Sequence, residues 1–86
     1  MHFNEELLTD ERYLRLTGKQ QSEHIANHCA EIEDRIRLAP SRLEAVRLKE
    51  LTCTKFKQEC QSTLVRTALT RYVEELIARH WDKKNI

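Results

Sequence analysis

The most regular pattern of apolar positions lies between residues 64 and 81, where apolar residues come in adjacent pairs every four positions. The pairs are Leu64-Val65, Ala68-Leu69, Tyr72-Val73, Leu76-Ile77 and His80-Trp81. At 100° per residue such pairs cover roughly 200–260° of a helix surface, whereas an ordinary surface helix shows a single stripe about 100° wide. The pattern therefore predicts a helix that is contacted from more than one direction.

A chain of 86 residues has few other helices with which to cover so wide a surface. A domain of this size buries only roughly 60–65% of its unfolded surface and often gains stability by association. We therefore predict a homodimer, or a complex with another helical protein, through this part of the chain. The predicted interface consists of Leu64, Val65, Ala68, Leu69, Tyr72, Val73, Leu76, Ile77 and Trp81.

A narrower apolar stripe predicts a helix over about residues 19–38. Its members recur at spacings of four, three and four, which is the helical period. They are Ile25, Cys29, Ile32 and Ile36. Arg35 and Arg37 lie in the last turn and Pro40 follows. This is a typical helix end, because cations suit the negative end of the helix dipole and proline cannot continue the helix.

A shorter helix is expected before it, over about residues 4–16. Asn4 or Thr9 can cap its N-terminus, because a side-chain oxygen there accepts from amide N–H groups that lack a partner within the helix. Thr17 and Gly18 then interrupt the pattern. A helix of this length is not stable alone, so we expect it to dock on the rest of the chain.

After Pro40 the chain contains no further proline or glycine, which predicts a long helical segment over about residues 41–81. Ser41 and Glu44 fit a capping box, in which each side chain accepts from the backbone amide of the other residue. The sharp turn at Pro40 predicts an αα-hairpin between this segment and the preceding helix.

The predicted fold is all-α. Residues 1–86 form a single domain, a bundle of three helices with a long C-terminal helix, and two copies associate into a dimeric bundle. The apolar stripe is poor in the first half of the long helix, so a kink or break is expected near residues 51–54 or 61–63.

The charge distribution changes this picture only slightly. The formal net charge is +1, but residues 1–40 hold five Lys and Arg against eight Asp and Glu, while residues 41–86 hold ten against six. Solvated helix faces of opposite sign account for this, and a basic surface for nucleic acid is the alternative. Four excess charges spread over a long helix fall short of the concentrated stripe that phosphate contacts usually need.

Cysteine usage and hydropathy bear on the compartment. The three cysteines are odd in number and fit no disulfide framework or zinc knuckle. No apolar run approaches the roughly 18–20 residues of a membrane span, and the polar start resembles no signal peptide. We therefore expect a protein of the reducing cytoplasm that does not bind membranes.

His24 and His28 are the nearest approach to metal chemistry, because two histidines four residues apart on a helix can share one metal ion. No third ligand follows at a matching spacing, so we predict no metal site. The chain shows no nucleophile with a neighbouring base and no glycine-rich phosphate loop. We predict neither enzymatic activity nor a cofactor.

Two stretches resemble a known family. Val46-Arg47-Leu48-Lys49 alternates apolar and basic residues, and residues 62–72 read Ser-Thr-Leu-Val-Arg-Thr-Ala-Leu-Thr-Arg-Tyr. Together they resemble the ribbon–helix–helix DNA-binding domain. The resemblance implies that Arg47 and Lys49 project from a paired ribbon into the major groove of DNA. The sequence departs from the family before Ser62, where no glycine is present to form the turn.

Two functions follow from these observations. We predict a non-catalytic, small cytoplasmic protein that presents helix faces to a second copy or to another helical protein, as an adaptor, a chaperone-like protein or a regulator. The alternative is a dimeric DNA-binding transcriptional regulator of the ribbon–helix–helix type that uses residues 44–81, with Arg47 and Lys49 as the nucleic-acid contacts.

Overall fold

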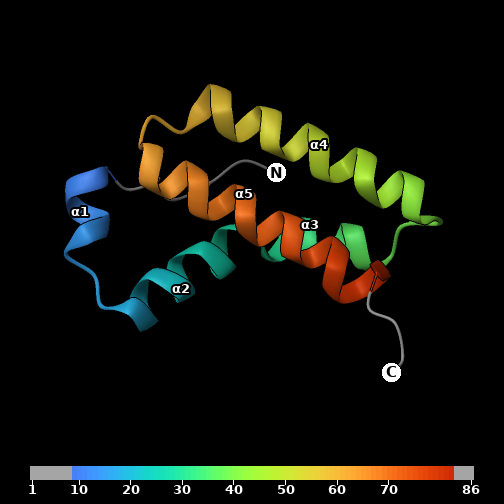
Figure 1. Ribbon diagram of the computed structural model, residues 1–86, viewed down its shortest axis with the longest axis horizontal. Helices are drawn as coiled ribbons and strands as arrows, with labels where there is room; N and C mark the ends of the chain where they lie inside the picture. The colour runs from blue at the N-terminus through green and yellow to red at the C-terminus, as the bar shows by residue number, and fades with distance from the viewer. Residues whose placement is uncertain (1–8, 83–86) are drawn as a thin grey trace.

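Five α-helices and a C-terminal π-helical turn form the part of the chain that the computed structural model describes, residues 9–82. They are α1 (Asp10–Leu14), α2 (Gly18–His28), α3 (Ala30–Arg37), α4 (Arg42–Glu59), α5 (Thr63–Ile77) and the π-helical turn η1 (Ala78–Asp82). Residues 9–82 contain no strand, so the all-α prediction is confirmed, whereas the three predicted helices are replaced by five (Figure 1). The expected cap at Asn4 lies outside the described residues.

The first two helices begin at side-chain caps. Thr9 caps α1, because its Oγ1 accepts from the Arg12 amide at 3.3 Å. Thr17 caps α2 in a capping box with Gln20, whose amide donates to Thr17 Oγ1 at 3.1 Å and whose side chain accepts from the Thr17 amide at 3.0 Å. The expected interruption is present between α1 and α2, and Gly18 is the first residue of α2.

The single helix predicted over residues 19–38 is wrong, because Cys29 divides it into α2 and α3. The Cys29 amide is shared between the carbonyls of Ile25 and Ala26, both at 3.1 Å, and its φ and ψ angles of −104° and 5° leave the helical range. The division lets the two halves follow different neighbours, since α2 packs on α5 whereas α3 packs on both α4 and α5.

The long segment predicted over residues 41–81 is also divided, at one of the two places where a break was expected. Helix α4 runs without interruption through residues 51–54 and ends at Glu59. Cys60 is extended, and Ser62 caps α5 because its Oγ accepts from the Val65 amide at 3.0 Å. The chain therefore turns back on itself, and α4 and α5 pack as an antiparallel pair (Figure 1).

The Pro40 turn agrees more closely with the prediction. Ser41 caps α4 by accepting from the Glu44 amide at 3.2 Å, which is the first of the two bonds of the predicted capping box. The Glu44 carboxylate lies 3.4 Å from the Arg47 guanidinium. Helices α3 and α4 pack against each other, so the predicted αα-hairpin is present.

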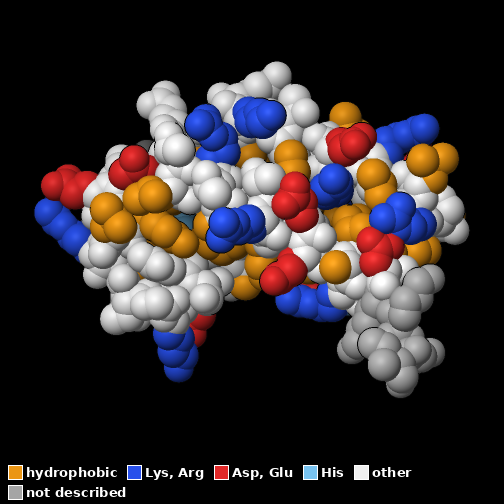
Figure 2. Space-filling view, viewed as in Figure 1, with side chains coloured by type: hydrophobic (Ala, Val, Ile, Leu, Met, Phe, Trp, Pro, Cys, Tyr) orange, Lys and Arg blue, Asp and Glu red, His pale blue; other side chains and the backbone are white. Residues whose placement is uncertain are grey.

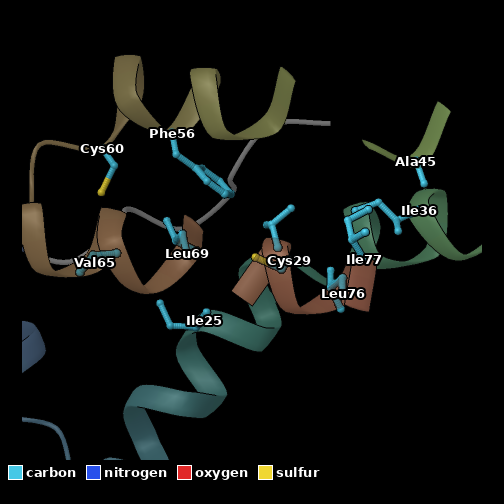
Figure 3. Close-up of a cluster of buried hydrophobic side chains, with 11 residues drawn as sticks. Ile25, Cys29, Ile36, Ala45, Phe56, Cys60, Val65, Leu69, Leu76 and Ile77 are labelled. Carbon is cyan, nitrogen blue, oxygen red and sulfur yellow. The ribbon is translucent and has the colours of Figure 1, made fainter. Parts of the chain in front are cut away.

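The hydrophobic core follows α5, with side chains from α4 on one side and from α2 and α3 on the other (Figure 3). Its buried members are Ile25, Cys29, Ile36, Ala45, Phe56, Cys60, Val65, Leu69, Val73, Leu76 and Ile77. Three residues of the stripe predicted in the second helix are buried here, and Ile32 packs against them while partly exposed. Within residues 9–82, no helix combines the length and the apolar character needed to cross a bilayer.

Candidate functional site

The adjacent apolar pairs of α5 separate into two rows with different environments. Val65, Leu69 and Val73, the second members of three successive pairs, have no exposed surface and form what we call the inner row. Their preceding neighbours form the outer row, which consists of Leu64, Ala68 and Tyr72. Ala68 and Tyr72 are half-buried and pack against the core with part of their surface. Leu64 is 39% exposed. Helix α5 therefore uses one face for its own core and keeps a second apolar face in contact with solvent.

The predicted interface is divided between buried and partly exposed residues. Five of its nine residues are covered by the chain's own helices, because α2, α3 and α4 all pack against or near α5. These five are Val65, Leu69, Val73, Leu76 and Ile77. Trp81 is partly buried, and its indole Nε1 donates to the Ile36 carbonyl at 2.7 Å. Association itself is not decided by a single chain and stays a prediction.

The outer row lines a groove between α5 and the first two helices, which we call the α5 groove. Its volume is ≈ 520 Å³, within the range of about 300–1,000 Å³ typical of ligand pockets. It is lined by Tyr13, Gln21, Ser22, Ile25, Leu64, Thr67, Ala68, Arg71, Tyr72 and Glu75. Figure 2 shows hydrophobic side chains gathered around a hollow between α1 and the first turns of α5.

Helix α1 forms one wall of the groove. It has no buried residue, and polar contacts attach it to α5 and α2. The Asp10 carboxylate accepts from the Ser62 hydroxyl and, at 3.2 Å, from the Leu64 amide. A carboxylate suits this position, because the N-terminus of α5 carries amide N–H groups and the positive end of the helix dipole. Gln21 adds a bond from its Nε2 to the Tyr13 carbonyl at 2.9 Å, which joins α1 to α2.

The opposite end of the groove is defined by Tyr72, whose ring is held from two sides. Its hydroxyl donates to Glu33 Oε1 at 3.2 Å, and the guanidinium carbon of Arg79 lies 5.9 Å from the ring centroid. Burial raises the pKa of the Tyr72 phenol, and the negative charge of Glu33 adds to this effect. The phenol is therefore a neutral hydrogen-bond donor at physiological pH.

A second hollow of ≈ 230 Å³ lies between α3 and α4. Ile32 and Leu48 contribute apolar surface to it, and Leu51 is 65% exposed at its edge. Arg35, which also lines it, forms an ion pair with Glu31 at 3.6 Å. This hollow is smaller than the α5 groove and contains none of the residues of the predicted interface.

The predicted nucleic-acid contacts do not lie on a ribbon. Arg47 and Lys49 are both within helix α4, and residues 44–50 are helical throughout. Two residues apart on a helix are separated by about 200° around its axis, so their side chains leave different faces. The strand implied by the resemblance to ribbon–helix–helix proteins is therefore absent from this segment, and the physical basis for inserting both cations into one groove of DNA is lost.

The two histidines singled out as possible ligands lie against each other. The ring centroids of His24 and His28 are 4.6 Å apart in an edge-to-face arrangement, and Tyr13 lies beside His24 at 6.4 Å. Over residues 9–82, no group of three or more His, Cys, Asp and Glu side chains is arranged to hold a metal ion. His24 therefore lies between Tyr13 of α1 and His28, while His28 also lines the hollow between α3 and α4.

Seven of the ten residues that line the α5 groove were missed by the sequence analysis. Three of them lie on α5 itself, namely Thr67, Arg71 and Glu75, and four come from the first two helices, namely Tyr13, Gln21, Ser22 and Ile25. Ile25 had been assigned to the core stripe of its own helix, where the structure also places it. The other three from the first two helices are polar or isolated aromatic residues without a periodic pattern, so only the packing of α1 and α2 on α5 brings them to the groove.

Comparison with protein-family models, curated proteins and solved structures gives no match to the chain.

Proposed function

We propose that the chain is a non-catalytic protein–protein interaction module that associates through the α5 groove, and that its first partner is a second copy of itself. The observation that carries this proposal is the outer row, an apolar face of α5 that stays accessible although the inner row already fills the core. Four residues of the predicted interface remain accessible at least in part, and three of them, Leu64, Ala68 and Tyr72, line this one groove.

The spacing of the outer row suits packing against another helix. Leu64, Ala68 and Tyr72 are four residues apart and form an i±4 ridge, the row by which helices most often pack in globular proteins, at a crossing angle of about −50°. Ala68 lies at the middle of the ridge between two larger side chains. A small residue at the crossing point lets the two helix backbones approach closely, while Leu64 and Tyr72 fill the space on either side.

The charges at the edge of the groove favour a second copy as the occupant. Arg71 and Glu75 lie on the same side of α5, one turn apart, and both line the groove. In a two-fold symmetric interface each patch meets its own copy. A patch with one cation and one anion can face its copy without a surplus of one sign.

The three free cysteines, two of them buried, support a reducing compartment such as the cytoplasm.

Sedimentation equilibrium of the wild type and two matched variants tests the proposal. Ala68→Glu places a carboxylate at the centre of the outer row, where association would bury it without a partner at a cost of several kcal/mol. Ala30→Glu makes the same substitution at the exposed first residue of α3, away from the groove and at a helix N-terminus that favours a carboxylate. Far-UV circular dichroism checks that each variant is folded.

We expect a dimer for the wild type and for Ala30→Glu, and an association weakened by about a hundredfold or more for Ala68→Glu, which corresponds to roughly 2.7 kcal/mol. Leu64→Glu, at the more exposed end of the outer row, is a second variant if Ala68→Glu loses its helical structure. A wild type that sediments as a monomer at high micromolar concentration contradicts the proposal, as does a folded Ala68→Glu that still dimerises.

A further inference from the structure

Glu33 occupies an unusual place next to the α5 groove, because three groups from the C-terminal part of the chain meet on its carboxylate. The Tyr72 hydroxyl lies 3.2 Å from Oε1, and the Nε2 of His80 and an NH group of Arg79 lie 3.1 and 3.5 Å from Oε2. Glu33 lies on α3, and its side chain is only 27% exposed. Through these contacts Glu33 joins α3 to α5 and to η1.

The π-helical turn explains how neighbouring residues reach the same carboxylate. In an α-helix consecutive side chains point about 100° apart, whereas the wider π-helical turn changes the directions in which the side chains leave the helix. In η1 the residues Arg79 and His80 both reach Glu33. The next two residues also make contacts outside the turn, because Trp81 bonds the Ile36 carbonyl and Asp82 pairs with Arg42. The end of α5 is thereby fixed to α3 and α4.

We infer that Glu33 is a positioning residue for the α5 groove: it fixes the ring of Tyr72 in the orientation that the partner helix meets. The inference rests on the proposed function, since Tyr72 ends the outer row. Glu33 itself does not line the groove, so its effect on association must pass through Tyr72. An ordered side chain loses less conformational freedom on binding, which increases affinity without adding a contact.

The first experiment measures the hold of Glu33 on Tyr72 in the folded chain. Tyr13→Phe leaves Tyr72 as the only tyrosine, so the ultraviolet absorbance of the phenolate reports its titration alone. In this background Glu33→Gln removes the negative charge that opposes ionisation of the phenol, so we expect the pKa of Tyr72 to fall. Glu31→Gln changes the same residue type on the same helix, but its ion pair is with Arg35. We expect it to leave the titration unchanged.

The second experiment measures the dissociation constant of the dimer. We expect Glu33→Ala and Tyr72→Phe each to weaken association by about threefold to tenfold, because a Tyr72 ring that is no longer held loses conformational freedom when the partner binds. Because Glu33 acts through Tyr72, the double variant should be no weaker than either single variant. Glu33→Gln keeps an acceptor for the Tyr72 hydroxyl and should recover most of the affinity. Glu31→Ala is the control and should bind as the wild type does.

The outcomes separate this inference from the proposed function. If the wild type is a monomer, self-association fails, and the titration still decides whether Glu33 holds Tyr72. If the dimer forms and Ala68→Glu abolishes it, additive effects of Glu33→Ala and Tyr72→Phe overturn the positioning role, because a merely structural carboxylate would act independently of the hydroxyl. An unchanged Tyr72 titration in Glu33→Gln also overturns it. Fluorescence of Trp81, the single tryptophan, checks that η1 stays folded.

Discussion

The inner and outer rows of α5 are offset by one residue in sequence, and they differ in how far their side chains are buried. Val65, Leu69 and Val73 are fully buried, whereas the residue before each is at least partly accessible. Adjacent residues of a helix point about 100° apart, so a run of adjacent apolar pairs describes two faces rather than one wide face. Each face needs its own explanation. The core explains the inner row, whereas the outer row packs only partly against the core and also lines the α5 groove.

The two rows also differ in the kinds of side chain that they contain. The inner row consists of Val and Leu, which fill a core and carry no polar atom. The outer row combines Leu64, the small Ala68 and Tyr72, whose hydroxyl is bonded to Glu33. A tyrosine combines an apolar ring with a polar hydroxyl, and such aromatic residues are enriched at binding surfaces. The width of an apolar pattern thus indicates how much of a helix surface is apolar, but not whether the surface is covered by the same chain.

The largest effect is expected where a charge is placed in the inner row. Val73→Glu buries a carboxylate at a fully buried position without a partner, which costs several kcal/mol. A small domain has roughly 5–15 kcal/mol of stability in total, so we expect the folded state to be mostly lost. Thermal unfolding followed by circular dichroism measures this.

Ala68→Glu provides the matched comparison, since it places the same side chain on the same helix but in the outer row. We expect it to keep a cooperative unfolding transition at low protein concentration, where association does not contribute. Equal losses of stability in Val73→Glu and Ala68→Glu would show that the distinction between the two rows is wrong.

A smaller effect is expected from the thiol of Cys29, which is buried at the turn between α2 and α3. Burial, with smaller effects of Cys53 and Glu33, raises the pKa of Cys29 from 9.0 to about 12. Between these values the unfolded chain releases the thiol proton and the folded chain retains it. Cys29 therefore contributes its full stability below pH 9, and this is lost as the pH rises towards 12, by about 1.4 kcal/mol per pH unit.

Urea unfolding over this pH range measures the effect. We expect the free energy of unfolding to fall less steeply with pH in Cys29→Ala than in the wild type. Cys60→Ala removes the other fully enclosed thiol and keeps Cys29, so it should retain the steeper fall. The same slope in all three proteins would mean that Cys29 is accessible to water.

The sequence predicted those features of the fold that depend on local chemistry. Thr9 and Ser41 were expected to be caps and are. The break expected near residues 61–63 occurs, because Ser62 can satisfy an amide at the start of a new helix. The stripe of the second helix was confirmed, since a spacing of three and four residues identifies the buried face whether or not the helix is continuous.

Features that depend on distant contacts were not predicted. The break at Cys29 has no proline or glycine to mark it, and beyond it α3 packs on α4 as well as on α5. Periodicity identified Val65, Leu69 and Val73 as contact residues but could not show that α2, α3 and α4 supply the contacts. The alternation around Arg47 is also compatible with a helix whose apolar residues face two directions, which is what α4 is.

The smallest effect is expected at Gly18, which is exposed and lies outside both rows of α5. Gly18 is the first residue of α2 and has a helical rather than a left-handed backbone. A Cβ added there would meet nothing within 4 Å, so the folded state does not require glycine. Gly18→Ala restricts the unfolded chain more than the folded one and should raise the free energy of unfolding by about 0.4–1 kcal/mol.

Thr17→Ala, one residue earlier, removes the cap of α2 and should lower the free energy of unfolding by about 1 kcal/mol. Urea unfolding of both variants at one protein concentration measures the two effects. Because neither side chain lines the α5 groove, the dimer dissociation constant should stay at its wild-type value. A loss of stability in Gly18→Ala would mean that a side chain at the start of α2 meets other atoms, contrary to the open space found there.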